Sequence, residues 1–327
     1  MFAPPKTGLA VVAVASLLMT ACAVSPSSES TEPVVETYAC GQLDLTVMMD
    51  PAHPLINLQY LDKGLLLKPS DTGAAGVYLA PGDPSTRLVR EEGRARLTIR
   101  GQEYPECLPP GAVALPFTAQ GSTPAWRARM QDDTLVLHPP YETDQTLQLP
   151  VALAEADRHG REFVAQADGV RVRLTVAGQL CQDPVTGGQF PYQVRLTVNG
   201  EVYDGCGGDP QRLFRGTEWV VEDLAGAGII DRSRLTLQFL ADDRIAGRAS
   251  CNRYQGQYQL SDSGALTVSG LGSTRMACAP ALMQQEARFL ELLGQVTRAR
   301  IGQDGSLRLS TDTSATMTAF QSDHDMP

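Results

Sequence analysis

The fold class of this chain is decided by the stretch VRLTVNGEVY at residues 194–203. Apolar and polar residues alternate on both sides of Asn199-Gly200, which is the period of a half-buried strand. An Asn-Gly pair between two such runs favours positive φ at both central positions and therefore a two-residue hairpin turn. The stretch predicts an antiparallel β-hairpin.

The same alternation recurs along the rest of the chain. It is seen in ARLTI at residues 95–99, in VRVRLTV at residues 170–176 and in LTLQF at residues 235–239. Turn residues separate such runs every 8–12 residues or so, a spacing typical of antiparallel sheets and small barrels. We therefore expect a mostly β protein.

One segment has a helical period instead. After Pro280, which suits a first helical position, apolar residues recur on one face at a period of 3.6 residues. The members of this face are Leu282, Met283, Phe289, Leu290 and Leu293, with Glu286 between them. This pattern predicts one helix near the C-terminus that packs on a sheet.

The N-terminus has the features of an export signal. Lys6 is followed by an apolar run at residues 8–19, which is too short for a membrane span, and the run leads to Met19-Thr20-Ala21-Cys22. We interpret residues 1–21 as a signal peptide cleaved before Cys22, which would then carry acyl chains of the palmitate type. The alternative is an ordinary cleaved signal that leaves Cys22 as a free thiol.

The residues after Cys22 bear on location. Ala23 and Val24 follow it, without the Asp that retains lipoproteins in the inner membrane, so we expect an outer-membrane lipid anchor with the body facing the periplasm. Exposure on the cell surface is left open. Residues 22–36 are rich in Ser, Pro and Glu and read as the lipidated cysteine and a flexible tether.

The mature chain is acidic. Without Lys6, 26 lysines and arginines remain against 37 aspartates and glutamates, a net charge of −11. No basic patch is concentrated enough to bind nucleic acid. The excess of acids is interpreted chiefly as a source of solubility.

Six cysteines remain once Cys22 is set aside, and an export signal puts them in an oxidising compartment. Sequence alone leaves 15 pairings open. Spacing favours one local disulfide per unit, pairing Cys40 with Cys107, Cys181 with Cys206, and Cys251 with Cys278. Metal binding is disfavoured because the chain has no C-x-x-C and only four histidines, none near a cysteine pair. No metal and no cofactor are expected.

Turn-rich stretches at residues 108–111 and 206–210 divide the mature chain into three units. We expect units at residues 37–110, 112–214 and 215–320, with a tail at residues 321–327. The short connections suggest a fixed array, although the sequence does not establish that the units pack together.

The third unit carries a specific series of motifs. Trp219 opens it, GRASCNRYQGQY follows at residues 247–258 and STRMAC at residues 273–278, ahead of the helix. This order resembles the META domain of the HslJ family, which implies a compact sheet-plus-helix domain in envelope lipoproteins associated with heat shock and antibiotic tolerance. The family supplies no catalytic residues. Asn252 and Gly256 are interpreted as turn residues around the disulfide, and Thr274 and Arg275 as structural.

The first unit begins with Tyr38-Ala39-Cys40, ends at Cys107 and contains AAGVY at residues 74–78 and REEGRARL at residues 90–97. It resembles the MliC family of membrane-bound inhibitors of c-type lysozyme. That resemblance implies a small antiparallel β-barrel closed by a terminal disulfide. It also implies a loop whose hydroxyl and cation pair with the two carboxyl groups in the lysozyme cleft.

This sequence departs from the inhibitor pattern at the contact positions. Ala74-Ala75 stand where the family has Ser-Gly, and Glu92-Gly93 where it has Lys-Gly. Alanine has no side-chain hydrogen bond to offer, and glutamate repels a carboxylate. A register shift would let Arg90 or Arg94 replace the cation. The candidate inhibitor-loop positions are Ala74, Ala75, Tyr78, Arg90, Glu92, Gly93 and Arg94.

The second unit carries FTAQGSTPAW at residues 117–126 and CQDPVTG at residues 181–187. It resembles an uncharacterised group of proteobacterial envelope proteins, which implies a β-rich fold and no particular function. We expect Trp126 in the core, Asp183 as the cap of a turn, and His138 in a loop.

These features favour a non-enzymatic envelope lipoprotein that protects the envelope under stress by binding a protein or wall ligand. Its expected partners are the membrane, through Cys22, and a c-type lysozyme or another envelope protein. An active lysozyme inhibitor is the first alternative. A cell-wall hydrolase is the second, and it lacks a Ser/His/Asp arrangement, a nucleophile elbow and a metal cluster. The ligand and the oligomeric state are not specified by the sequence.

Overall fold

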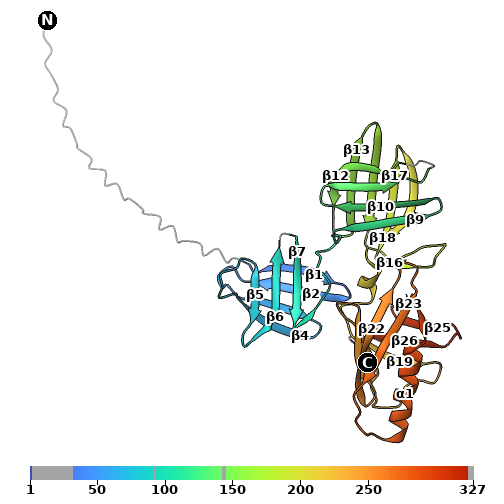
Figure 1. The fold of residues 1–327 in the computed structure, drawn as a ribbon. Helices are drawn as coiled ribbons and strands as arrows, with labels where there is room; N and C mark the ends of the chain where they lie inside the picture. Colours follow the sequence, from blue (N-terminus) through green and yellow to red (C-terminus); the bar gives the residue numbers. More distant parts are fainter. Residues whose placement is uncertain (2–31, 92, 142–144, 323–327) are drawn as a thin grey trace.

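The computed structural model describes residues 1, 32–91, 93–141 and 145–322. Within these ranges, three eight-stranded β-sheets follow one another, and a single α-helix lies near the C-terminus (Figure 1). The predicted fold class, mostly β with one C-terminal helix, is confirmed. Cys22 and most of the predicted tether lie outside the described residues.

The first sheet is a meander of eight antiparallel strands, each hydrogen-bonded to the next. Its ends approach each other through residues 107–108, since Leu108 pairs with Ala39 of the first strand and Cys107 with Ala95 of the seventh. This arrangement gives the sheet the barrel-like curl that was expected. The strands are β1 (Val34–Cys40), β2 (Leu43–Met49), β3 (Ile56–Tyr60), β4 (Lys63–Pro69), β5 (Val77–Ala80), β6 (Asp83–Glu91), β7 (Arg94–Ile99) and β8 (Gln102–Glu103).

The second sheet is a closed eight-stranded barrel. The hairpin predicted at Asn199-Gly200 joins β17 to β18, and both turn residues have positive φ, 52° and 97°. Alternate residues fill the barrel with one apolar core. The barrel strands are β9 (Phe117–Ser122), β10 (Ala125–Gln131), β11 (Thr134–His138), β12 (Leu147–Ala156), β13 (Gly160–Ala167), β14 (Val170–Ala177), β17 (Tyr192–Val198) and β18 (Glu201–Gly207).

A small hairpin outside this barrel, which we call the flap (residues 181–190), is made of β15 (Cys181–Gln182) and β16 (Gln189–Phe190). The Cys181–Cys206 disulfide fastens the flap to β18 of the barrel. Phe190 is buried, with 3% of its surface exposed. The flap is therefore a fixed part of the structure and covers part of the outer barrel wall.

The C-terminal unit is an eight-stranded sheet with the order β23-β22-β21-β20-β19-β26-β25-β24. Its helix α1 (Pro280–Gly294) buries Gln285, Phe289 and Leu293, so the buried face is narrower than predicted and Met283 lies outside it, 48% exposed. The strands are β19 (Trp219–Leu224), β20 (Thr236–Phe239), β21 (Arg244–Ala249), β22 (Asn252–Leu260), β23 (Leu266–Ser273), β24 (Val296–Ile301), β25 (Leu307–Thr311) and β26 (Thr316–Gln321).

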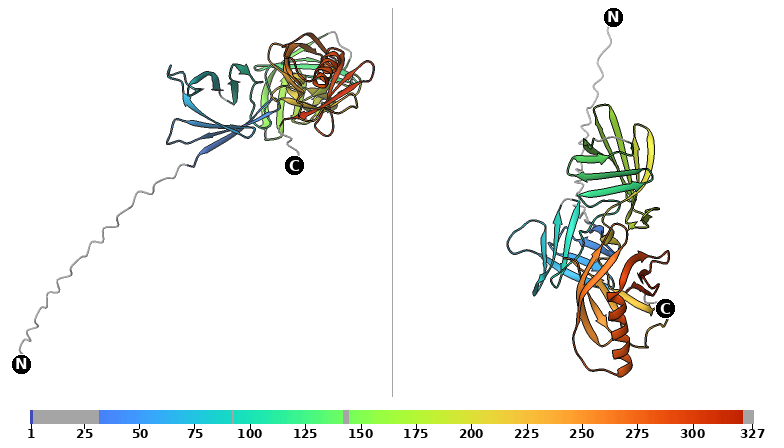
Figure 2. Two further views of the ribbon diagram at one scale, coloured as in Figure 1. Left: turned by 90° about the horizontal axis from the view of Figure 1, so that it is seen from below. Right: turned by 45° about the vertical axis from the view of Figure 1, so that its right-hand side comes forward.

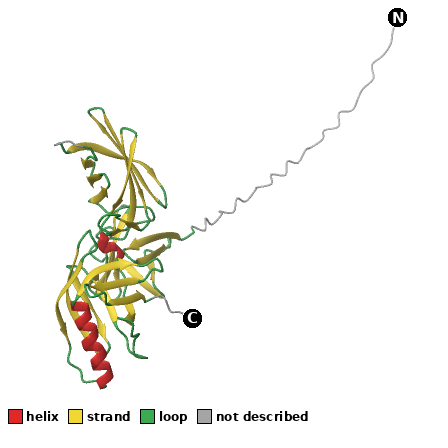
Figure 3. Cartoon of the chain, turned by 90° about the vertical axis from the view of Figure 1, so that its right-hand side faces the viewer, coloured by secondary structure: helices red, strands yellow, loops and turns green. Residues whose placement is uncertain are grey.

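The three units meet at the 3-10 helix η1 (Pro210–Leu213), which links the barrel to the C-terminal unit (Figure 3). The guanidinium group of Arg212 donates to the carbonyl oxygens of Ala39 (3.1 Å) and Glu106 (3.0 Å) in the first unit. In return, the Gln42 amide N–H donates to the Arg215 carbonyl at 2.8 Å. Burial lowers the pKa of Arg212. These contacts hold the first unit against the C-terminal unit, as the views in Figure 2 also show.

Close backbone approach reinforces this junction. A side chain on Gly41 would meet the Arg215 carbonyl oxygen at 2.3 Å, and one on Gly216 would meet the Cys40 carbonyl oxygen at 2.4 Å. Both glycines also have positive φ. The chain therefore needs glycine at both positions for the two units to touch.

Candidate functional site

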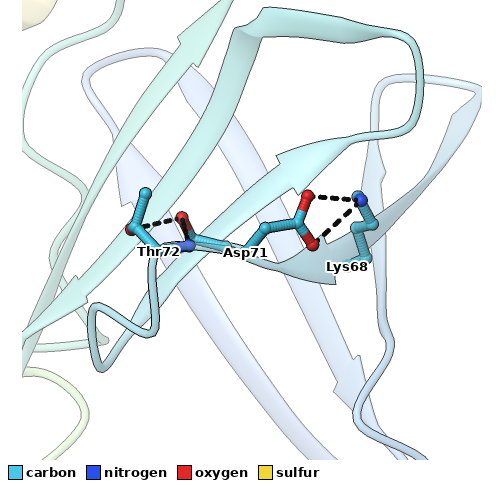
Figure 4. Close-up of polar contacts among 4 residues, drawn as sticks. Lys68, Asp71 and Thr72 are labelled. Atoms are coloured by element: carbon cyan, nitrogen blue, oxygen red, sulfur yellow. Dashed lines mark hydrogen bonds and ion pairs between the residues drawn. The ribbon is translucent and has the colours of Figure 1, made fainter.

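The candidate inhibitor loop of the first unit lies between β4 and β5. Ala74 and Ala75 are exposed in it, and Tyr78 of β5 is half-buried. The loop is held by its own contacts: Lys68 bonds both carboxylate oxygens of Asp71, at 3.0 and 3.2 Å, and Ser70 bonds Thr72 at 2.8 Å (Figure 4). The two alanines follow these contacts in the same exposed turn.

This turn lies beside Arg90. The Arg90 amide N–H donates to the Gly76 carbonyl oxygen at 2.8 Å, and a side chain on Gly76 would meet the Arg90 carbonyl oxygen at 2.3 Å. The structure therefore brings together four of the predicted positions, Ala74, Ala75, Tyr78 and Arg90, on one edge of the first unit.

The charge of Arg90 is already paired. Its guanidinium group donates to both carboxylate oxygens of Glu36, each at 2.7 Å, and the Tyr38 hydroxyl donates to the same carboxylate at 2.6 Å. Burial lowers the pKa of Arg90, but the Glu36 carboxylate outweighs it and leaves the pKa raised. Burial and Glu36 together raise the pKa of Tyr38. Arg90 can reach an outside carboxylate only by leaving Glu36.

Arg94 is also engaged within the first unit, at 3.2 Å from the Glu106 carboxylate. Gly93 is exposed in the turn before it, and Glu92 lies outside the described residues. Arg90 and Arg94 are the two cations that a register shift of the inhibitor loop would offer. Each is therefore already paired with an acid of the first unit. Sequence alone did not indicate this, because both acids lie outside the motif, Glu36 at 54 residues from Arg90 and Glu106 at 12 residues from Arg94.

A cleft of about 480 Å³ lies where the turn at Gly93-Arg94 faces one end of the barrel. Barrel residues of β12 and β13 line it with apolar side chains, and Leu153 is 55% exposed although it shares a face with the buried Ala165. The connecting segment adds Val113 and Leu115, of which Leu115 is 37% exposed. Exposed apolar surface of this kind, concentrated in a cleft between units, is typical of a binding site.

Charges of both signs surround this cleft. Arg94 and Arg161 lie at its rim, as do Asp132 and Asp133 of the β10–β11 turn. Apolar walls with a mixed, polar rim are the usual composition of a protein-recognition surface. The cleft can accommodate an apolar side chain or two from a partner while its rim makes polar contacts.

The motif residues of the C-terminal unit form a structural network. Asn252 is buried, 5% exposed, and its amide nitrogen donates to Glu286 of α1 at 3.0 Å. Its amide oxygen accepts from the Thr274 hydroxyl (2.7 Å) and from the Met276 N–H (2.8 Å). Asn252 begins β22 and is not the turn residue that was predicted. It ties the strand, the loop before the helix and the helix together.

Gly256 is likewise inside β22, at a register shift, where a side chain would meet Leu271 and the Ser269 carbonyl at 2.9 Å. Thr274 is structural, as expected, because its hydroxyl bonds Asn252. These motif residues therefore account for the architecture of the unit and carry no reactive group of their own.

Of the three expectations for the second unit, two are confirmed and one is wrong. Trp126 is in the barrel core, 2% exposed, and Asp183 caps a turn by accepting from the Val185 and Thr186 amides at 3.0 and 2.7 Å, so both predictions are confirmed. His138 is the last residue of β11 and is exposed, so its placement in a loop was wrong. The alternation of β11 continues one residue further than the following prolines suggested.

The three disulfides favoured by spacing, Cys40–Cys107, Cys181–Cys206 and Cys251–Cys278, are present. Among the described residues, no three His, Cys, Asp or Glu side chains gather as metal ligands would. Within the same part of the chain, no helix has the length and apolar character needed to cross a membrane.

Comparison with known proteins gives one family and two related structures. Residues 211–324 match the family model of the META domain. A solved NMR structure of a protein from Burkholderia xenovorans is 28% identical over 34% of this chain and 86% of its own, with a TM-score of 0.30. A second NMR structure is 30% identical over 35% of this chain and 96% of its own, with the same TM-score. No curated protein matches the chain.

Proposed function

We propose, from the META domain that residues 211–324 form, that this chain is a non-enzymatic envelope lipoprotein that protects the envelope under stress by binding a protein partner. The observation that carries the proposal is the cleft between the first unit and the barrel, with Leu153 exposed in its wall. Two contacts with the C-terminal unit support it. Arg212 holds the first unit there, and Gln189 of the flap holds the barrel there through the Ile301 backbone. A cleft pre-organised in this way loses little entropy on binding.

The test is affinity capture from envelope extract with the mature chain and with Leu153→Asp. A carboxylate in the apolar wall should remove the partner that the wild-type chain retains. Val202→Asp is the matched control, because Val202 is a valine of β18 with 57% of its surface exposed and lies outside the cleft. A partner that both variants retain equally contradicts the proposal for this cleft.

The same captures should include isolated peptidoglycan, since a wall ligand is the other occupant to consider. Muropeptides released by the chain alone would instead support a cell-wall hydrolase. The non-enzymatic proposal expects intact peptidoglycan after prolonged incubation.

The membrane anchor is the second part of the proposal. Cys22 is proposed to carry acyl chains that hold the body at the outer membrane, facing the periplasm, on the strength of residues 8–22. Labelled palmitate should enter the wild-type protein and not Cys22→Ala, which should appear in the soluble periplasmic fraction. Equal labelling of the two proteins would remove this part of the proposal.

Inhibition of c-type lysozyme is the second candidate function. It is favoured by one observation, that the Ala74-Ala75 turn and Arg90 share an edge of the first unit. The paired state of Arg90 and the missing hydroxyl count against it. Mature chain should be added to lysozyme acting on cell-wall substrate. No inhibition at tens of micromolar rejects this function without affecting the cleft proposal.

A further inference from the structure

A second surface of the barrel, separate from the cleft above, carries two neighbouring arginines. It lies on the outer face of β9, β10 and β11, on the side nearest the C-terminal unit (Figure 1). In one cross-strand row Arg127 pairs with Gln120 and His138, and in the next Arg129 pairs with Thr118 and Val136. Because the side-chain period of a strand is two, all of these residues point away from the barrel core.

These rows form the floor of a groove of about 300 Å³. Phe190 of the flap lines it from one side, and Asp262 of the β22–β23 turn lines it from the C-terminal unit. The Gly188 backbone packs on this turn so closely that a side chain there would meet the Asp262 carbonyl oxygen at 1.8 Å. The groove is therefore composite, and it exists because the flap docks the barrel onto the C-terminal unit.

The arginines of this groove lack acidic partners. Within the described ranges no carboxylate lies within 4.0 Å of Arg127 or Arg129, and Arg129 has only a 3.3 Å contact with the Gln131 amide. Asp262 forms no ion pair with either of them there. Both guanidinium groups are therefore free of a carboxylate within the described residues, although the chain as a whole has a net charge of −10. A guanidinium group presents a planar fork that matches carboxylate and phosphate oxygens.

We propose that this groove binds a small organic oxyanion, a carboxylate or a phosphate monoester. Arg127 and Arg129 hold the anionic group, and its apolar part lies against Val136 and Phe190. Two residues of strand separate the arginines by about 7 Å, so both forks reach one oxyanion from either side. The volume is at the lower end of ligand sites in proteins, which limits the ligand to a small molecule.

The test uses four six-carbon probes that differ only in their head group, measured by calorimetry with the mature chain. Hexanoate and hexyl phosphate should bind at least tenfold more tightly than hexanol, and hexylammonium should not bind. Comparison of hexanoate with hexyl phosphate identifies the preferred oxyanion, and inorganic phosphate alone shows how much the apolar part contributes. Equal affinity for hexanol and hexanoate would overturn the proposal, as would no binding of either anion below about 10 mM.

Variants locate the site. Arg127→Gln with Arg129→Gln should weaken anion binding at least tenfold, and Val136→Glu should abolish it by placing a carboxylate directly across from Arg129. Arg171→Gln is the matched control, because Arg171 is an exposed arginine of β14 outside the groove. The exposed arginines leave the barrel core untouched, which circular dichroism should confirm. An equal loss in Arg171→Gln would show that the charge of the barrel as a whole, and not this groove, attracts the anion.

Discussion

The side chain of Gln189 pairs with the backbone of Ile301 as a neighbouring strand would. Its amide oxygen accepts from the Ile301 N–H at 2.7 Å and its amide nitrogen donates to the Ile301 carbonyl at 3.0 Å. Gln189 belongs to the flap of the barrel and Ile301 ends β24 of the META domain. A single side chain thus satisfies both backbone groups at the edge of another unit, and this fixes the position of the flap.

Gln189→Ala should weaken the contact between the flap and the META domain. It leaves the donor and the acceptor of Ile301 without their protein partner, at a cost of about 1–2 kcal/mol. The Ile301 amide proton should therefore exchange about tenfold faster with solvent, as measured by hydrogen exchange. Gln193→Ala, an exposed glutamine of β17, is the control and should leave the rate unchanged. If the Ile301 amide exchanges at the same rate in all three proteins, Gln189 does not hold the flap to the META domain.

The strands could be predicted from the sequence, whereas the contacts between the units could not. Alternation and the Asn199-Gly200 turn are local signals, and they determine which face of a strand is buried. Gln189, Arg212 and Gly41 make side-chain or backbone contacts with a different unit, and such contacts leave no period in the sequence. The same limit explains why the sequence offers Arg90 as a cation for the inhibitor loop, since its partner Glu36 lies on β1, 54 residues earlier.

Asn252 was assigned to a turn for a related reason. Asparagine before a Gly-containing segment usually indicates local hydrogen bonding. Its partners here, Glu286 and Thr274, come from a helix and a loop that follow more than 20 residues later. The motif was recognised correctly, but only the structure assigns the role of its central residue.

Asn252→Ala should be among the most destabilising single changes in the META domain. It removes one acceptor and one donor from a buried network, leaving the Thr274 hydroxyl, the Met276 amide and the Glu286 carboxylate with fewer partners. We expect a loss of about 2–4 kcal/mol in the free energy of unfolding. Urea unfolding followed by the fluorescence of Trp219, with Trp126→Phe in every protein compared, measures it.

The neighbouring Arg253 provides the control for this experiment, because its side chain is exposed. Arg253→Ala should change the free energy of unfolding by less than about 0.5 kcal/mol. If the two alanine variants unfold at the same urea concentration, Asn252 does not have the linking role that its contacts indicate.

Arg212→Lys tests the junction of the three units. The guanidinium group of Arg212 donates to the Ala39 and Glu106 carbonyls at the same time. A lysine ammonium group is a single point charge on a shorter side chain and cannot reach both in this way. The first unit should therefore move more freely relative to the META domain, and small-angle scattering should give a larger radius of gyration. Arg96→Lys, at an exposed ion pair with Glu91, should scatter as the wild type does. A radius unaffected by Arg212→Ala as well would show that the glycine contacts alone hold the junction.

Asp183 should make stability depend on pH. Burial raises its pKa, but hydrogen bonds from Ser122, Thr186 and Val185 outweigh burial and leave the pKa below its ordinary value. A carboxyl group whose pKa is lower in the folded than in the unfolded chain stabilises the fold above the unfolded pKa of about 3.9. That stabilisation is lost as the pH falls through the lowered folded pKa.

Asp183→Asn removes this titration. Its amide oxygen can still accept from Val185 and Thr186 in place of Oδ1, whereas its NH2 group replaces Oδ2, the oxygen that accepts from the Ser122 hydroxyl. The variant should therefore be less stable than the wild type at pH 7, and the difference should shrink as the pH falls below about 4. Thermal unfolding of both proteins between pH 2.5 and 7 measures it, with Asp204→Asn as the control at an 82% exposed carboxylate. A difference that stays constant over this range would mean that Asp183 acts through the shape of its turn and not through its charge.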